Sequence, residues 1–140
     1  PKSGNIVTED GEILGKHTGL FNYTIGQRKG LGIAYKHPLY VIGFNGERNE
    51  VIVGPNERLF TNRMICKFYN FLDDTIYKEL KAEGKIRYAA NPSPCTARIL
   101  DDDTMEVIFD EPQRAITPGQ SVAFYNGTQL LGGAVIDRVC

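Results

Sequence analysis

The chain has 140 residues, of which 41% are hydrophobic and 24% are charged, and its formal net charge is −1. This composition is typical of a soluble globular protein and excludes a disordered chain or a coiled coil. No apolar run reaches the roughly 18 residues that a membrane helix needs, and no charged-then-apolar leader opens the chain. We therefore expect no membrane partner. Because the chain begins at Pro1 and not at a methionine, we also expect an excised piece of a longer protein.

Breaker residues divide the chain into short segments. The 15 glycines and 7 prolines interrupt β-branched and aromatic residues, which predicts many short strands. An Asp-Gly turn between residues 6–8 and residues 12–14 predicts one β-hairpin. Residues 39–44 and 51–53 have the pattern of a second hairpin, which turns near residues 45–49.

Two features are expected between these hairpins. Thr18 is placed to cap a short helical turn over residues 19–25, which Gly26 would close. Residues 26–32 contain three glycines and are predicted to form a loop.

The second half of the chain has a more regular spacing of strands and turns. Residues 101–103 and the Asn-Gly pair at residues 126–127 are predicted turns. Residues 75–82 are compatible with a helical turn, although their apolar spacing is sparse. Six strands with polar turns between them predict a small closed barrel. The expected strands are residues 64–71, 85–88, 96–100, 105–109, 121–125 and 129–136.

A Gly-Pro-Asn break at residues 54–56 marks the expected domain boundary. We predict a small β-rich domain over residues 1–57 and a six-stranded β-barrel over residues 58–140. The fold class expected from the sequence is therefore mainly β.

The three cysteines predict neither a disulfide framework nor a structural zinc site, because their number is odd and no CxxC pair exists. Cys66 and Cys95 lie beside strand-like runs and are predicted to be buried or neutral thiols rather than nucleophiles. The third cysteine, Cys140, is the last residue of the sequence. A reducing cytoplasm is the expected compartment. With His17 and His37 as the only histidines, the sequence predicts no metal site and no catalytic residue set.

Charge is segregated along the chain although the total is near zero. Residues 13–46 and residues 84–100 contain basic side chains and no acid, whereas six acids lie within residues 101–111. Two basic surfaces of this kind would suit a phosphate backbone. Chance clustering on solvated faces explains the pattern equally well. The acidic run is interpreted as a solvated turn and strand face.

The glycine-rich loop contains Gln27, Arg28 and Lys29. Glycines let backbone N–H groups approach an anion closely, and the two cations add positive charge. The spacing matches neither GxxxxGK[ST] nor GxGxxG, so a small nucleotide pocket is not predicted. We expect the two cations to face a polyanion or another domain, with plain solvation as the simpler alternative.

One expected strand alternates cations with apolar residues, so that Lys85 and Arg87 share the outer face if the isoleucine between them is buried. An arginine beside an aromatic ring such as Tyr88 can hold a phosphate and stack on a base. A surface arginine beside a core tyrosine is the simpler interpretation. Residues 117–120 have the pattern of a type II turn. The amide of Gln120 can contact sugar or phosphate there, although most such turns are only connections.

Several strings of this sequence, taken together, resemble the bacterial tRNA-specific 2-thiouridylase family. The resemblance spans essentially the whole chain, and the string Tyr-Thr-Ile-Gly-Gln-Arg-Lys-Gly-Leu-Gly is its most specific part. The matching strings lie at residues 4–7, 11–17, 19–20, 23–32, 40–42, 48–49, 85–88, 112–120 and 131–133, and Cys95 also matches.

That resemblance implies a parent enzyme with three parts, of which this chain is similar to the central domain and the C-terminal, translation-factor-like barrel. The family adenylates the wobble uridine of certain tRNAs with ATP and magnesium, and then replaces its C2 oxygen with sulfur from a cysteine persulfide. The resemblance places ATP, magnesium and both catalytic cysteines before Pro1. The fragment is therefore expected to hold no cofactor and to be noncatalytic.

The resemblance also implies partners: tRNA, the parent's own N-terminal catalytic domain, and a sulfur-donor protein. The alternatives are a structural module that mainly scaffolds the catalytic domain, and a barrel that binds a protein. The basic segments favour tRNA docking, whereas the near-neutral total favours the scaffold. The family's tRNA contacts map onto Arg87, Tyr88 and Gln120, and further candidates for a tRNA or interdomain contact are Gln27, Arg28, Lys29 and Lys85.

Overall fold

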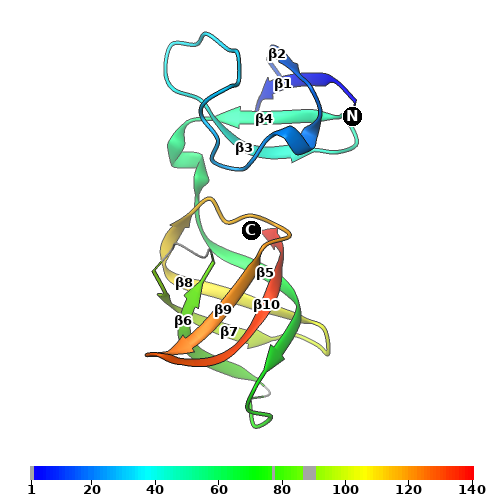
Figure 1. The fold of residues 1–140 in the computed structure, drawn as a ribbon. Coiled ribbons are helices and arrows are strands. Elements are labelled where there is room, and N and C mark those ends of the chain that lie inside the picture. The colour runs from blue at the N-terminus through cyan, green and yellow to red at the C-terminus, as the bar shows by residue number, and fades with distance from the viewer. Residues whose placement is uncertain (1, 77, 87–90) are drawn as a thin grey trace. The chain divides into compact units, whose positions relative to one another are not determined.

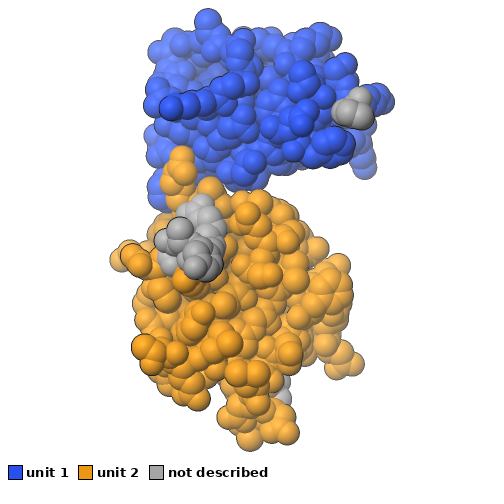
Figure 2. Space-filling view, viewed as in Figure 1, with its two compact units in different colours: residues 1–60 blue, residues 61–140 orange. Residues whose placement is uncertain are grey.

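The computed structural model describes residues 2–76, 78–86 and 91–140. The chain divides into two compact units, residues 1–60 and residues 61–140 (Figure 2). The Gly-Pro-Asn break lies shortly before this division. Within the described ranges, no helix has the length and apolar character needed to cross a membrane.

One sheet organises the first unit, and its strands are β1 (Gly4–Thr8), β2 (Ile13–His17), β3 (Tyr40–Asn45) and β4 (Glu50–Gly54) (Figure 1). Both predicted hairpins are confirmed, because β1 pairs antiparallel with β2 and β3 pairs antiparallel with β4. A parallel pairing of β1 with β4 joins the hairpins in the order β2-β1-β4-β3. This pairing connects segments that are distant in sequence, so local patterns do not predict it.

The core of the first unit also anchors the long segment between its hairpins. Ile6, Val41 and Val51 are fully buried inside the sheet. Leu31 and Leu39, each 8% exposed, come from the segment between β2 and β3 and pack into the same cluster. The irregular chain between these two leucines is therefore held at both ends.

The helical turn after β2 is shorter than predicted. It is a single 3₁₀ turn, η1 (Leu20–Asn22), and Gly19 occupies its N-cap without a side-chain hydrogen bond. The prediction that Thr18 caps it is wrong, because the Thr18 hydroxyl instead accepts a hydrogen bond from the Asn22 side-chain amide at 3.1 Å. A second 3₁₀ turn, η2 (Asn56–Leu59), follows β4.

The second unit is a closed six-stranded barrel, as predicted, with strand order β10-β5-β8-β7-β6-β9 (Figure 1). Its interior is filled by side chains such as Met64, Met105, Phe109 and Phe124, each at most 1% exposed. The strands are β5 (Phe60–Phe71), β6 (Glu79–Lys85), β7 (Ser93–Ile99), β8 (Thr104–Arg114), β9 (Ser121–Asn126) and β10 (Gln129–Val139).

The position of β6 corrects two predictions. The strand expected over residues 85–88 is β6 at Glu79–Lys85, and residues 79–82 of the expected helical turn lie inside that strand. Glu, Leu, Lys and Ala all favour helices locally. Here the alternation of buried and exposed residues favours a strand, because Leu80, Ala82 and Gly84 face the core. Pairing of β6 with β7 and β9 then completes the barrel.

Candidate nucleic-acid interface

The barrel topology brings two of the predicted contact residues to the same end of neighbouring strands. Lys85 is the last residue of β6 and pairs with Ala123 of β9. Gln120 directly precedes β9 and is exposed. Ile86, which follows Lys85, is 3% exposed, so the condition under which the sequence places Lys85 on the outer face is met. Arg87 and Tyr88 lie outside the described residues, so the face assigned to Arg87 stays a prediction.

The turn that presents Gln120 is rigidly connected to the barrel. The Gln120 N–H donates to the Thr117 carbonyl at 3.2 Å, and Gly119 has φ +90°, as a type II turn requires. The Gly119 N–H donates to the Ile136 carbonyl at 2.7 Å, and the Ile136 N–H donates to the Gln120 carbonyl at 2.8 Å. Backbone bonds to β10 thus fix the turn, and the exposed Gln120 side chain projects from a rigid support.

The acidic run is only partly the solvated face that the sequence predicted. Asp101 is exposed and caps its own turn, because its carboxylate accepts the N–H groups of Asp103 and Thr104 at 2.9 and 2.8 Å. Glu106 is instead 8% exposed. Its carboxylate accepts hydrogen bonds from Arg63 at 2.7 Å and from Arg98 at 3.1 Å. Arg98, one cation of the second basic segment, is therefore paired with an acid.

The Arg63 hydrogen bond, together with the positive charges of Arg63 and Arg98, holds the pKa of Glu106 below its ordinary value of 4.5, although burial opposes that shift. A carboxyl with a lowered pKa in the folded state stabilises the fold above its unfolded-state pKa, and this contribution disappears as the pH falls through the folded-state value. We expect Glu106→Gln to cost about 1 kcal/mol at neutral pH, because both arginines are well exposed and solvent weakens the pairs.

The measurement is chemical denaturation of the wild type and of Glu106→Gln between pH 7 and pH 3. The difference in unfolding free energy should shrink as the pH falls below about 4.5. Glu111→Gln, an exposed acid on the same strand, is the matched control and should differ little from the wild type at either pH. A Glu106 difference that does not depend on pH would contradict the ion-pair assignment.

In the glycine-rich loop, the side chain of Gln27 has an internal role. Its Oε1 accepts the Thr24 N–H at 3.0 Å, and its Nε2 donates to the Lys29 carbonyl at 2.9 Å. Its backbone carbonyl accepts the Val41 N–H at 2.9 Å, which ties the loop to β3. Gln27 therefore shapes the loop, whereas Arg28 and the side chain of Lys29 lie exposed beside it.

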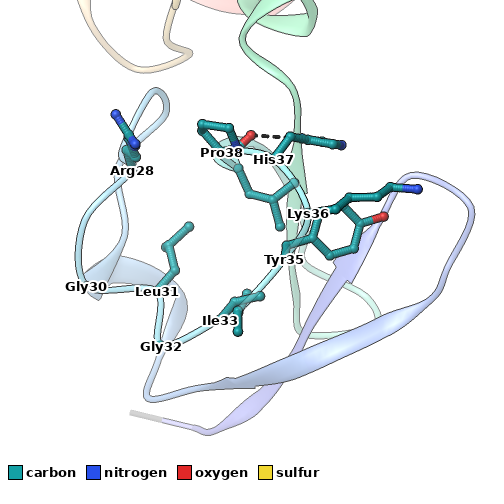
Figure 3. A pocket seen from close by; sticks show the side chains of 11 residues that line it. Arg28, Gly30, Leu31, Gly32, Ile33, Tyr35, Lys36, His37 and Pro38 are labelled. Carbon is teal, nitrogen blue, oxygen red and sulfur yellow. Dashed lines mark hydrogen bonds between the residues drawn. The ribbon is translucent and has the colours of Figure 1, made fainter.

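Arg28 and residues 30–39 line an open groove of about 730 Å³, which the sequence did not predict (Figure 3). Leu31 and Ile33 lie between Arg28 on one side and Tyr35 and Pro38 on the other (Figure 3). No sequence pattern assigned residues 33–38 to any element. The signal that could have found the groove is the mixture of aromatic, cationic and apolar residues in an acid-free segment.

Four residues of the resemblance motifs form a structural cluster: Gly4, His17, Gly19 and Asn49. The Gly19 N–H donates to His17 Nδ1 at 3.0 Å, so Nε2 carries the proton and donates to the Asn49 carbonyl at 2.7 Å. The Asn49 side-chain amide donates to the Ser3 carbonyl at 2.9 Å. A Cβ atom on Gly4 would overlap the Asn49 carbonyl oxygen. His17, 1% exposed, is thus a satisfied core histidine that ties the end of β2 to the β3–β4 turn.

The prediction of buried thiols is confirmed for two cysteines. Cys66 is 0% and Cys95 is 3% exposed, and burial raises the pKa of each thiol to about 12. A thiol with that pKa remains protonated at neutral pH and is a poor nucleophile. Cys140 is exposed at the end of the second unit.

Comparison with known proteins identifies both units. Residues 61–136 match the model of an aminomethyltransferase beta-barrel domain, and residues 1–55 match that of a tRNA methyl transferase PRC-barrel domain.

Full-length relatives carry the same two regions. A tRNA-specific 2-thiouridylase from Clostridium botulinum (strain Alaska E43 / Type E3) is 48% identical over 99% of this chain, which spans 38% of that relative. The enzymes of that name from Clostridioides difficile (strain 630) and Geobacter metallireducens are 47% and 46% identical over 98% and 96% of the chain, which spans 38% and 36% of their lengths. The chain belongs to the tRNA-specific 2-thiouridylase family and corresponds to the C-terminal part of these relatives.

Proposed function

We propose that the chain is the tRNA-docking C-terminal portion of a tRNA 2-thiouridylase and is itself noncatalytic. The observation that carries this proposal is the 48% identity over 99% of the chain with an enzyme named for that activity. The barrel supports it, because Lys85 and Gln120 lie at the same end of neighbouring strands. Arg87 and Tyr88 follow Lys85 closely in sequence and complete the proposed contact set.

In this proposal, the parent enzyme works in the cytoplasm and converts the wobble uridine to 2-thiouridine. ATP and magnesium, held by its N-terminal domain, supply the adenylation that activates the uridine, and a donor protein supplies persulfide sulfur. The described residues of this chain do not fit that chemistry. Among them, no group of three His, Cys, Asp or Glu side chains could hold a metal ion. Cys66 and Cys95 are protonated at neutral pH.

A second candidate function is a scaffold that mainly supports the catalytic domain. The observation that favours it is the ion pairing of the barrel surface, since Arg63 and Arg98 both bind Glu106 and leave less positive charge for RNA. The two functions differ in one measurable property, the affinity of the chain for tRNA.

The test is tRNA binding by variants at the proposed barrel contacts. We expect Arg87→Ala and Gln120→Ala to weaken binding of a tRNA transcript that has a wobble uridine. Loss of one phosphate contact should flatten the salt dependence of binding by about one unit of log–log slope for Arg87→Ala. Arg87→Lys should recover only part of the loss if the contact is bidentate, because an ammonium group lacks the planar fork.

The matched control is Gln129→Ala, which removes the same amide from the opposite end of the barrel, at the start of β10. Its tRNA affinity should equal that of the wild type. If Arg87→Ala lowers the melting temperature while the salt slope stays unchanged, Arg87 has a structural role and the scaffold function gains support.

A separate calorimetric titration tests the assignment of ATP to the missing domain. We expect no saturable binding of ATP with magnesium at micromolar concentrations to this chain, because its glycine-rich loop lacks the phosphate-binding spacing and Gln27 is engaged within the loop. Saturable micromolar binding would place a nucleotide site in these residues and refute that assignment.

A further inference from the structure

The groove lined by Arg28 and residues 30–39 combines the chemical features of a binding site. Its volume of about 730 Å³ lies within the range of about 300–1,000 Å³ typical of small-molecule sites. Leu31, Ile33 and Leu39 give it an apolar wall, and the side chain of Leu31 is anchored in the core. The backbone at Gly32 is open, because a Cβ atom there would meet nothing within 4 Å.

The charged side chains that line this groove have a single sign, although Glu9, Asp10 and Glu12 line a neighbouring hollow that shares Tyr35 and His37 with it. Arg28 and Lys36 line it together with His37, and none of the described lining residues is an acid. The Lys36 ammonium lies 5.8 Å from the centre of the Tyr35 ring, and the centres of the Tyr35 and His37 rings lie 5.0 Å apart in a T-shaped arrangement. Cations beside an aromatic ring suit a ligand that is both anionic and aromatic.

We propose that this groove binds one unpaired nucleotide of an RNA strand. The base would lie against the apolar wall near Tyr35, and a flanking phosphate would contact Arg28 or Lys36. Unpaired bases are the parts of RNA that proteins read by stacking, and open, cation-lined grooves follow the strand backbone. The inference rests on the proposed function in one respect only, that the strand belongs to tRNA.

The experiment measures binding of a fluorescent pentauridylate RNA to the 140-residue chain by anisotropy at several salt concentrations. We expect Lys36→Gln to weaken binding about fivefold, and loss of one phosphate contact should reduce the salt slope by about 0.7, the value for single strands. Ala34→Trp, which places a large ring in the groove without changing its charge, should abolish binding. Lys16→Gln, an exposed lysine on β2 outside the groove, is the matched control and should retain wild-type affinity.

The outcomes separate the alternatives. Equal losses for Lys36→Gln and Lys16→Gln would indicate general charge attraction and overturn the proposal. Calorimetric binding of AMP or ATP that Ala34→Trp abolishes, without any binding of the RNA strand, would assign the groove to free nucleotides, which also overturns the proposal. An RNA affinity unchanged in Ala34→Trp would show that the strand binds elsewhere and would overturn the proposal.

A parallel titration with whole tRNA distinguishes the two proposals. If Gln120→Ala weakens tRNA binding while pentauridylate binding does not respond to Lys36→Gln, the groove proposal fails and the proposed function stands. If no tRNA binds at all, the proposed function fails, and the pentauridylate series still decides whether the groove accepts a nucleotide.

Discussion

Gly4→Ala should destabilise the first unit by about 2–4 kcal/mol. The new Cβ atom would overlap the Asn49 carbonyl oxygen and lie 2.7 Å from His17 Nε2 and 2.8 Å from Asn49 Nδ2. Two of these neighbours are the donor and the acceptor of the hydrogen bond between His17 and Asn49. Relief of the overlap must move the β3–β4 turn or the histidine, and either movement breaks that buried bond.

Gly43→Ala is the matched control in the same sheet. A Cβ atom on Gly43 meets nothing within 4 Å, and its backbone does not have the positive φ that disfavours alanine. It should be neutral or stabilise slightly, because alanine loses less chain entropy than glycine on folding. Denaturant unfolding followed by the amide signals of β1 and β4 measures both variants. Equal stabilities for the two would contradict the close-approach role of Gly4.

Local turn chemistry explains most of what the sequence predicted correctly. The Asp-Gly and Asn-Gly turns form because their glycines adopt the positive φ that tight hairpin turns require, +91° at Gly11 and +61° at Gly127. The Pro-Gly turn before Gln120 follows the same logic with Gly119. These conformations are specified by one or two neighbouring residues, so a single sequence reveals them without any knowledge of the tertiary fold.

Residues whose environment forms only in the folded chain were harder to predict. Strand β6 is composed of good helix formers, and only its pairing with β7 and β9 decides its conformation. Glu106 lies in an acidic run, yet arginines from two other strands surround it. The sequence suggested Gln27 as a contact residue, but its side chain forms hydrogen bonds to the backbone of Thr24 and Lys29 within its own loop.

The candidate contact sites show the same contrast between features set by neighbouring residues and features that form only in the folded chain. Gln120 was predictable because a turn motif exposes it, whereas the groove depends on the packing of Leu31 and Leu39 into a core that other segments build. The groove lies within the first unit, and the Gln120 turn lies within the second. The two proposed RNA contacts lie on different compact units, so each can be tested by variants of its own unit.

Phe109→Ala should destabilise the barrel by about 3–5 kcal/mol, the usual cost of truncating a buried phenylalanine. Phe109 is 1% exposed, and its ring lies against Gly84 and the buried Cys95. A unit of this size has a total stability of about 4–12 kcal/mol, so the loss is a large fraction of it. We expect the barrel signals to unfold at much lower denaturant concentration while those of the first unit keep their midpoint.

Ile108→Ala is the matched control, since Ile108 directly precedes Phe109 on β8 and is 39% exposed on the outer face. Its cost should be about 1 kcal/mol or less, because little apolar area is removed from a buried site. Under conditions that unfold only the barrel of Phe109→Ala, contacts from Gln120 should be lost while pentauridylate binding by the first unit persists. If both units unfold in a single transition at the same midpoint, they depend on each other for stability, and contacts on the two units could not then be measured separately in this way.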